Sequence, residues 1–258
     1  MRFIMVEDWD LTGIRVLVTR PEPQASRLCQ SIQERGGVAY NCPMIDITPL
    51  QPALPLAEWR RYDWLIFVSA NAVRFALDVG MRPMADVRIA AIGPATAKVL
   101  EKAGFPVTCQ APAPYTSESL LTVPALREVA GQKLLIVKGQ GGRELLQETL
   151  RDRGAEVSVA EVYRRTCPRQ QAVERLHQVL SENITVVTAT SGEILANLIK
   201  AANGMTGRLL QLPIVVVSER LADLARIKGF THIIIAASAS DMAILKAIEQ
   251  WRVAAAES

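Results

Sequence analysis

The sequence contains the same strand–turn–helix unit twice, and this repeat constrains the fold more than any other feature. The strand ending at Arg20 and the helix ending at Gly36 match the strand ending at Lys138 and the helix ending at Gly154, each pair being 118 positions apart. In each copy an apolar strand precedes a helix that stops at a glycine, the residue that adopts a left-handed conformation at low cost. Two copies of one unit predict two similar lobes.

A second set of matches indicates which segments form each lobe. Ser69 matches Ser191 at a spacing of 122, Gly104 matches Gly229 at 125, and Ser117 matches Ser240 at 123. The residues between Arg15 and Arg169 contain matching segments of both sets in their own order. The unit that begins at Arg15 must therefore be completed by residues after Arg169, and the other lobe is inserted between these two parts. We therefore expect lobe 1 to comprise residues 12–41 and 170–258, lobe 2 to comprise residues 56–158, and a connecting ribbon to comprise residues 42–55 and 159–169.

Short apolar runs alternate with helical patterns along the chain. Runs such as Leu134–Val137 suit strands that are covered on both faces, and alternating βα units favour parallel sheets. Because the chain crosses between the lobes in opposite directions, the ribbon is expected to be antiparallel. The predicted fold class is α/β, with two flavodoxin-like parallel-sheet lobes, helices on both faces of each sheet, and a two-stranded β ribbon between them. Ser117 or Ser119 is expected to cap the helix that follows.

Small and hydroxyl-bearing residues stand at the turns between strands and helices in both lobes. In open α/β sheets, ligands bind at the carboxyl ends of strands, where helix N-termini present unpaired N–H groups. Any one of these residues is explained by capping or tight turning, but as a set facing one cleft they predict a surface for a polyanion. They are Ser69, Gly93, Thr96, Gly139, Gly141, Gly142, Thr190, Ser191 and Ser218.

Several other functional classes are not favoured. A net charge of +3 implies no strong field for nucleic acid, so no nucleic-acid partner is expected. The segment from Gly139 to Glu144 lacks the third glycine of a dinucleotide fingerprint, and no GxxxxGK[ST] motif occurs. The four cysteines are scattered, so no metal site is expected. A serine–histidine–aspartate triad would have to use His177 or His232, for which structural or solvated roles are favoured.

The sequence also gives expectations about location. The first ten residues include Glu7, Asp8 and Asp10, which fit no signal peptide. No apolar run approaches the roughly 18 residues of a membrane helix, so no membrane partner is expected. We expect a cytoplasmic protein. A monomer is the default, because no amphipathic surface is left over once both sheets are covered.

Four segments, taken in order and at their spacing, resemble uroporphyrinogen-III synthase. They are VLVTRP, DWLIFVSANAV, IAAIGPATAKVLEKAGF and KLLIVKGQGGRELLQETLRDRGAEVSVAEVYRRTCP. The resemblance covers nearly the whole chain and implies two α/β lobes joined by a β ribbon, as derived above. It also implies a lyase of heme and siroheme biosynthesis that needs no cofactor or metal. This lyase cyclises hydroxymethylbilane to uroporphyrinogen III, inverts the last pyrrole ring (ring D) and releases water.

The resemblance assigns roles to particular residues. It implies that Tyr163 is the general acid, since a phenol keeps its proton at neutral pH and hydroxide leaves poorly without one; the alternative is a half-buried ribbon tyrosine. Lys138 stands where the family commonly has arginine, and Ser218 begins a segment that departs from the family's glycine–threonine pattern. The substrate-binding residues expected from the turns and the resemblance together are Arg20, Ser69, Asn71, Gly93, Thr96, Lys138, Gly139, Gly142, Thr190, Ser191 and Ser218.

The expected partner is a small molecule, a linear tetrapyrrole with eight carboxylates. Because the chain is only mildly basic, backbone amides rather than a dense cationic patch are expected to bind them. A transient contact with the enzyme that forms hydroxymethylbilane is compatible with this role. The alternative from another class is a non-catalytic two-lobed binding protein for a small polyanion. A nucleotide- or flavin-binding module is the third interpretation.

Overall fold

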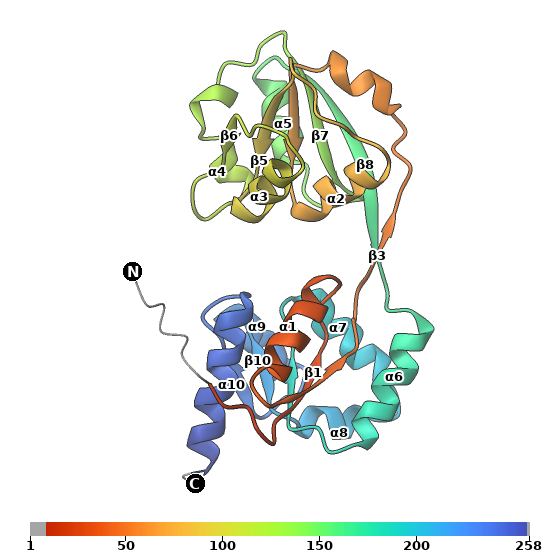
Figure 1. Ribbon diagram of the computed structural model, residues 1–258, viewed down its shortest axis with the longest axis vertical. Coiled ribbons are helices and arrows are strands. Elements are labelled where there is room, and N and C mark those ends of the chain that lie inside the picture. The colour runs from red at the N-terminus through yellow and green to blue at the C-terminus, as the bar shows by residue number, and fades with distance from the viewer. Residues whose placement is uncertain (1–8, 257–258) are drawn as a thin grey trace. The chain divides into compact units, whose positions relative to one another are not determined.

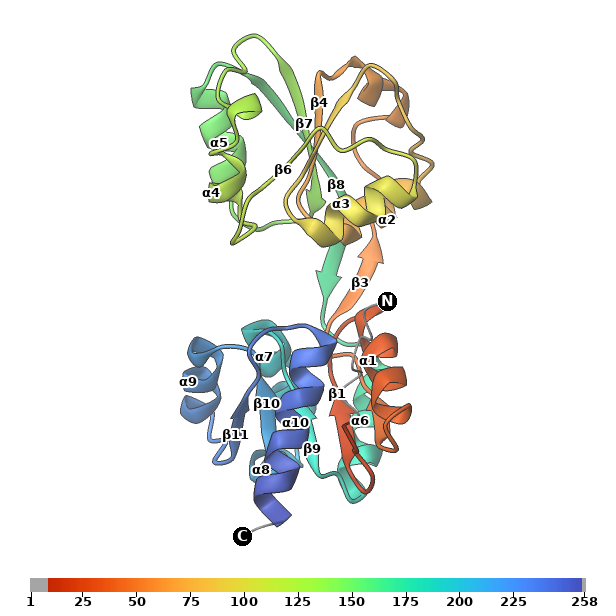
Figure 2. The same ribbon diagram turned by 60° about the vertical axis from the view of Figure 1, so that its left-hand side comes forward.

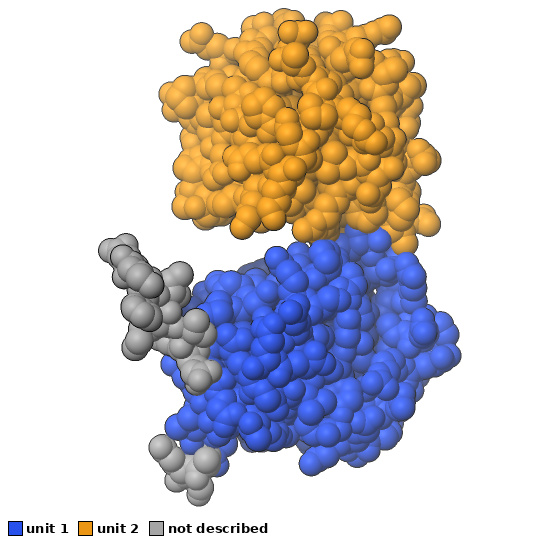
Figure 3. Space-filling view, in the orientation of Figure 1, with its two compact units in different colours: residues 1–47, 166–258 blue, residues 48–165 orange. Residues whose placement is uncertain are grey.

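The chain folds into two compact units, which Figure 3 colours separately. The structure is a computed structural model that describes residues 9–256. Unit 1 comprises residues 1–47 and 166–258, and unit 2 comprises residues 48–165. The divisions after Ile47 and Arg165 both fall within the segments predicted to form the ribbon. Unit 2 is therefore inserted into unit 1 along the chain.

Unit 1 is built on a sheet of five parallel strands in the order β11-β10-β9-β1-β2. Figure 1 labels β1 and β10 of this sheet. The strands are β1 (Arg15–Val18), β2 (Val38–Asn41), β9 (Val186–Thr188), β10 (Ile214–Val216) and β11 (Ile233–Ile235). The helices are α1 (Gln24–Gln33), α6 (Gln170–Ser181), α7 (Gly192–Ala201), α8 (Thr206–Gln211), α9 (Glu219–Ile227) and α10 (Asp241–Ala256).

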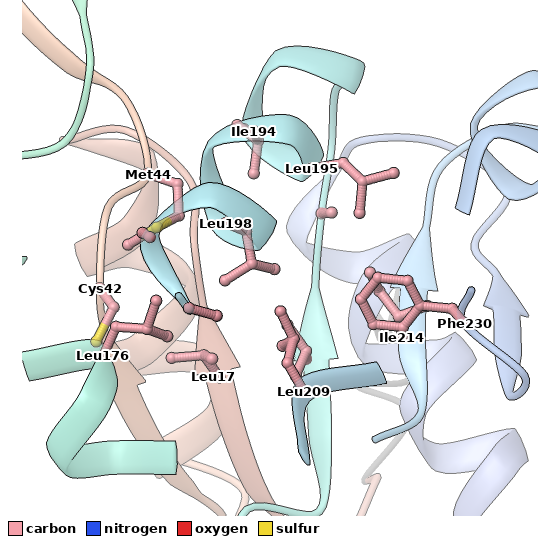
Figure 4. Close-up of a cluster of buried hydrophobic side chains, with 14 of the residues drawn as sticks. Leu17, Cys42, Met44, Leu176, Ile194, Leu195, Leu198, Leu209, Ile214 and Phe230 are labelled. Carbon is pink, nitrogen blue, oxygen red and sulfur yellow. The ribbon is translucent and has the colours of Figure 1, made fainter. Parts of the chain in front are cut away.

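Successive side chains of these strands point to opposite faces of the sheet, so unit 1 has two apolar cores. Leu17 and Val187 belong to the core under α6, α7, α8 and α9, where Figure 4 shows Leu17 on one side of the cluster and Phe230 beside Ile214 on the other. Val16 and Val186, one residue earlier in the same strands, belong to the core under α1 and α10, which lie on the other face of the sheet (Figure 2). Burial on both faces explains why these strands read as continuous apolar runs.

Unit 2 contains a second sheet, in the order β3-β8-β7-β4-β5-β6. The strands are β3 (Asp46–Pro49), β4 (Trp64–Phe67), β5 (Arg88–Ala91), β6 (Cys109–Gln110), β7 (Lys133–Gly139) and β8 (Glu156–Thr166), of which β4 to β8 are parallel. The helices are η1 (Leu56–Arg61), α2 (Ala70–Asp78), α3 (Pro94–Lys102), α4 (Ser117–Leu120), η2 (Pro124–Leu126) and α5 (Leu145–Asp152).

The strands of the two sheets have the same spatial order, but the chain enters this order at a different strand in each unit. In unit 1 the order β2-β1-β9-β10-β11 is the 2-1-3-4-5 order of flavodoxin-like sheets. In unit 2 the order β8-β7-β4-β5-β6 places β7 and β8 where unit 1 has β1 and β2. These are the pairs of strands that the spacing of 118 residues relates. The fold class predicted from the repeat is confirmed.

The ribbon pairs β3 with β8. Leu50 N donates to Val162 O at 2.9 Å, and Arg164 Nε donates to Thr48 Oγ1 at 3.3 Å. The later residue of the first segment, Leu50, pairs with the earlier residue of β8, Val162, so the two strands are antiparallel, as predicted.

Some local features differ from the sequence-based expectations. The helix α8 and the 3-10 turn η1 were not anticipated, because both are short and carry weak periodic patterns. The expected cap of α4 was wrong: Thr116 is the capping residue, and its Oγ1 accepts from Ser119 N at 3.2 Å while Ser119 Oγ accepts from Thr116 N at 2.8 Å. This reciprocal pair is a capping box, in which Ser119 occupies the third helical position. None of the described helices is long and apolar enough to cross a membrane.

Replacing Leu198 with alanine is expected to destabilise unit 1 selectively. Leu198 is fully buried in α7, and such truncations cost about 2–5 kcal/mol of unfolding free energy. Because unit 2 has its own core, hydrogen exchange measured by mass spectrometry should accelerate in unit 1 and change little in β4 and β7. Leu134→Ala, in the core of unit 2, should give the reverse pattern. Equal acceleration in both units for either variant would contradict the separation of the cores.

Candidate functional site

A pocket of about 500 Å³ lies at the carboxyl edge of the unit 2 sheet. It is at the switch point between β4 and β7, from which the chain's crossovers proceed in opposite directions, the usual place for a ligand in such sheets. Its lining comes from the ends of β4, β5, β7 and β8, from the loop before α5, and from the first turns of α4 and α5. The lining residues are Val68, Ser69, Ile92, Ser117, Ile136, Lys138, Gly139, Gln140, Gly141, Gly142, Arg143, Leu146, Gln147, Tyr163 and Arg165.

An extra residue in β8 determines the direction of the Tyr163 side chain. Lys138 pairs with Glu161, but the next residue of β7, Gly139, pairs with Tyr163, so Val162 forms a bulge. Residues two apart in a regular strand share a face, whereas the bulge places Glu161 and Tyr163 on opposite faces. Tyr163 is therefore directed toward α2, where its ring stacks on Phe75 with the ring centroids 5.4 Å apart.

Gly139 provides the space for the Tyr163 ring. A Cβ atom at position 139 would lie 2.5 Å from both Cε2 and Cζ of Tyr163 and 2.9 Å from its hydroxyl oxygen. No side chain fits at that distance. The tyrosine crosses directly over the glycine backbone and is only 4% exposed. The half-buried ribbon tyrosine considered from the sequence is thus a buried residue that lines the pocket.

Ser69 connects the tyrosine to a helix N-terminus. Its Oγ accepts a hydrogen bond from Ala72 N at 3.0 Å and so caps α2. The same Oγ lies 3.2 Å from the hydroxyl oxygen of Tyr163, and either hydroxyl can donate. When Ser69 donates, the proton of Tyr163 is available to a ligand in the pocket. After proton transfer, the same serine hydroxyl can stabilise the phenolate.

The glycine-rich loop after β7 forms another wall of the pocket. Gly141 and Gly142 have φ values of +71° and +86°, a region that glycine occupies at little cost. Gln140 N donates to Tyr163 O at 2.7 Å, and Gly141 N donates to Glu161 Oε1 at 3.1 Å, so the loop is attached to β8 at two points. Within the described chain the Gly142 N–H has no partner and remains available to an anion, as do the first N–H groups of α5.

Three cationic side chains line the pocket. Lys138, at the end of β7, is half-buried. Arg143 follows the glycine loop and pairs with Glu118 of α4 at 2.6 Å. A backbone hydrogen bond and Thr116, together with this pairing, hold the pKa of Glu118 below its usual range. Arg165 is the third. Arg143, Arg165, Gln140 and Gln147 were not predicted from the sequence, although they flank the predicted glycines and Tyr163.

The remaining predicted residues of unit 2 have local structural partners. Gly93 caps α3 beneath Tyr115, and Thr96 is buried in the first turn of the same helix. Asn71, in the first turn of α2, accepts a hydrogen bond from Arg74 at 3.1 Å. These residues lie along the carboxyl edge without lining the pocket.

Four predicted residues belong to unit 1. Ser191 caps α7 by accepting from Ile194 N at 3.2 Å, and Ser218 caps α9 by accepting from Leu221 N at 3.3 Å. Thr190 precedes Ser191 and is half-buried. Arg20 is only 7% exposed, and its guanidinium donates to Asp241 of α10 at 2.6 Å. The predicted set is thus divided between the two units, at the carboxyl edges of both sheets.

Cysteine and histidine side chains show no arrangement for nucleophilic or metal chemistry in the part of the chain that the structure describes. Burial raises the pKa of Cys29 to about 11 and that of Cys42 to about 12, and it also raises the pKa of Cys109. His177 Nε2 lies 2.7 Å from the carbonyl oxygen of Ala201, a structural contact. Among the described residues, no three histidine, cysteine or acidic side chains gather as a metal site requires.

Comparison with known proteins identifies one family. A model described as "Uroporphyrinogen-III synthase HemD" matches residues 26–246. Uroporphyrinogen-III synthase of Salmonella typhimurium (strain LT2) is 36% identical over 246 residues, covering 91% of this chain and 99% of the relative. The synthase of Escherichia coli (strain K12) is 35% identical over 244 residues, with the same coverage of both chains.

Solved structures with low sequence identity share the fold. A mutant uroporphyrinogen III synthase from the extremely thermophilic bacterium Thermus thermophilus has a TM-score of 0.58 at 18% identity, covering 95% of this chain and 100% of that one. Uroporphyrinogen-III synthetase from Helicobacter pylori has a TM-score of 0.59 at 14% identity, covering 92% of this chain and 99% of that one.

Alkylation of the folded protein by iodoacetamide at about pH 8 is expected to occur mainly at Cys167. Cys167 is exposed, whereas the raised pKa values of the other three thiols lower their thiolate fractions at this pH. Peptide mass spectrometry measures the modification at each site. Cys167→Ser should leave a slowly reacting protein, and denaturant should expose all the remaining thiols. Modification of Cys42 as fast as Cys167 in the folded protein would contradict the burial of Cys42.

Proposed function

The chain belongs to the uroporphyrinogen-III synthase family and is an enzyme of tetrapyrrole biosynthesis that cyclises hydroxymethylbilane; from this premise we propose that Tyr163 is its general acid. The reaction closes the linear tetrapyrrole to uroporphyrinogen III, inverts ring D and releases water. Without an enzyme the substrate closes with no inversion. The protein must therefore hold the chain so that the substituted carbon of ring D reacts, which is catalysis largely by positioning.

The observation that carries the proposal is that Tyr163 and Ser69, whose hydroxyl oxygens are 3.2 Å apart, both line the unit 2 pocket. The C–O bond of the hydroxymethyl group breaks, and the departing oxygen takes the proton of Tyr163 to leave as water. The pyrrole nitrogen stabilises the resulting cation, and attack by the substituted carbon of ring D gives the spiro intermediate, in which that carbon carries two methylene bridges. The original bridge bond from ring C to that carbon then breaks, and the released methylene carbon bonds to the unsubstituted α-carbon of ring D, which inverts the ring. The α-carbon of ring D that forms the new bond loses its proton, which restores the aromatic pyrrole, and this proton returns to the phenolate, so Tyr163 ends the cycle unchanged.

Ser69 is proposed to act through Tyr163. Its hydroxyl oxygen accepts from Ala72 N, so its proton is free to be donated to the phenol oxygen 3.2 Å away. This hydrogen bond directs the Tyr163 proton toward the ligand and stabilises the phenolate formed on transfer. The N-terminus of α2 adds a favourable field for negative charge at this position.

The carboxylates of the substrate are proposed to bind mainly to N–H groups and hydroxyls. In unit 2 the donors are Gly142, the first turn of α5, and the α2 and α3 starts at Asn71, Gly93 and Thr96, with Lys138 adding a positive charge. Eight carboxylates exceed the donors of one pocket, so we propose that the carboxyl edge of unit 1 contributes as well. Its donors are Arg20, Thr190, Ser191 and Ser218, and the N-cap roles of the two serines support their positions near free N–H groups.

We also propose a role for the ribbon, a cellular location and an oligomeric state. Residues 42–55 and 159–169 are proposed to form a hinge between a lobe of residues 12–41 and 170–258 and a lobe of residues 56–158, which lets the enzyme accommodate a flexible ligand. A substrate with eight carboxylates does not cross a membrane unaided, which supports action in the cytoplasm where it is made. We propose a monomer that contacts the hydroxymethylbilane-forming enzyme only transiently.

Tyr163→Phe is expected to reduce turnover by about 10²-fold or more, because general acid catalysis typically contributes about 10²–10⁴-fold. The ring and its stacking on Phe75 remain, so the unfolding free energy should change by about 1 kcal/mol or less. The measurement is the rate of formation of the type III isomer from fresh hydroxymethylbilane, with oxidation and separation of the products. Unchanged turnover would remove Tyr163 from the mechanism. A wild-type protein that binds substrate but yields only type I at the spontaneous rate would refute the function.

Gly139→Ala is expected to impair turnover as strongly as Tyr163→Phe, because the added methyl group would displace the tyrosine ring from above β7. The matched control is Gly131→Ala, at a position outside the pocket with φ +72° and no atom within 4 Å of an added Cβ. This control should cost about 1–2 kcal/mol of stability and leave turnover unchanged. Full activity of Gly139→Ala would show that the ring position is not required.

A further inference from the structure

Tyr115 has a costly backbone conformation at the carboxyl edge of unit 2. Among the described residues other than glycine, it alone has a positive φ, +61°. This left-handed conformation is unfavourable for a bulky side chain, whereas glycine and asparagine adopt it readily. Such a conformation persists only where the surroundings fix it. Here Tyr115 N donates to Pro112 O at 2.9 Å, and the next residue, Thr116, caps α4.

A second position is adapted to the same ring. Gly93 has an extended backbone that any residue could adopt, with φ of −169°. A Cβ atom at Gly93 would nevertheless lie 3.2 Å from Tyr115 Cβ and 3.6 Å from Tyr115 Cγ. The side chain of Tyr115 therefore lies over the start of α3, and glycine at position 93 leaves room for it. The tight contact is with Tyr115 Cβ, whereas the ring would be in ordinary van der Waals contact with a side chain at position 93.

The ring remains largely exposed despite these constraints. Tyr115 is 47% exposed, so the strain is not offset by burial in a core. Its sequence neighbours on both sides of the contact line the pocket: Ile92 precedes Gly93, and Ser117 follows Tyr115 by two residues. Tyr115 is therefore close to the lining of the pocket that contains Tyr163, without itself belonging to that lining. A ligand larger than the pocket would extend onto residues next to the lining.

We propose that Tyr115 is a substrate-binding residue whose exposed ring packs against a pyrrole ring of the linear tetrapyrrole. The inference rests on the proposed function of the unit 2 pocket. Aromatic pairs gain from stacked or edge-to-face packing beyond the burial of area, and a tyrosine offers a rigid apolar surface with a hydroxyl that stays hydrated. Carboxylate contacts hold the acidic side chains of the substrate, which are themselves flexible. An aromatic contact beside the pocket acts on a pyrrole ring directly.

The test compares Tyr115→Asn with Tyr115→Phe. Asparagine tolerates the left-handed backbone and removes the ring, whereas phenylalanine keeps the ring. For Tyr115→Asn we expect KM to rise about 2- to 10-fold, the range that corresponds to one aromatic contact, with kcat within about twofold and a melting temperature equal to or above that of the wild type. Tyr115→Phe should keep the wild-type KM. Initial rates of type III isomer formation over a range of substrate concentrations give both constants.

Two control variants keep the outcomes distinct. Ile227→Asn removes an exposed apolar side chain of unit 1, 79% exposed, and should leave KM unchanged. Tyr115→Gly, which also relieves the backbone strain, should reproduce the KM effect if the asparagine variant unfolds. Unchanged KM in both ring-deleted variants overturns the proposal, as does an equal rise of KM in Tyr115→Phe. Failure of the wild-type protein to form the type III isomer would instead refute the proposed function.

Discussion

Parallel strands that are buried on both faces leave only one place in each unit for chemistry. Their side chains are committed to the two apolar cores, as those of β1 and β9 are in unit 1. Polar groups therefore collect at the carboxyl edge, where each strand meets the free N–H groups of the next helix. Ser69, Ser191 and Ser218 cap helices at this edge. Their hydroxyls satisfy one amide each and leave the neighbouring amides available to anions.

In unit 2 the regular alternation of side chains along β8 is interrupted at one residue. The bulge at Val162 moves Tyr163 from the face of Glu161 to the face of α2, and the missing side chain of Gly139 lets the ring cross β7. Phe75 holds the ring from one side and Ser69 contacts the hydroxyl. The proposed acid is therefore positioned by the backbone pairing of two strands, which is more rigid than a loop. A positioning mechanism needs such rigidity in the residue that meets the reacting oxygen.

The sequence was sufficient for the architecture, because repeats and apolar runs are properties of order and spacing. The matched pairs Arg20–Lys138 and Gly36–Gly154 predicted the permuted sheets, and the serine turns predicted helix starts at the carboxyl edge. The direction of the Tyr163 side chain could not be predicted from the sequence, because it depends on the register between β7 and β8. The pairing of Arg20 with Asp241 joins residues whose proximity no local pattern indicates. The positive φ of Tyr115 was equally hidden, because nothing in an aromatic residue signals a left-handed backbone.

The insertion of unit 2 into unit 1 has a mechanical consequence. Both ends of the described chain belong to unit 1, and unit 2 is attached through two neighbouring antiparallel strands of one ribbon. Tension applied between the two ends would load the sheet of unit 1 first. None of it would reach the carboxyl ends of β4 and β7 in unit 2 until the sheet of unit 1 came apart. The part of the chain that holds Tyr163 is therefore shielded from pulling at either terminus.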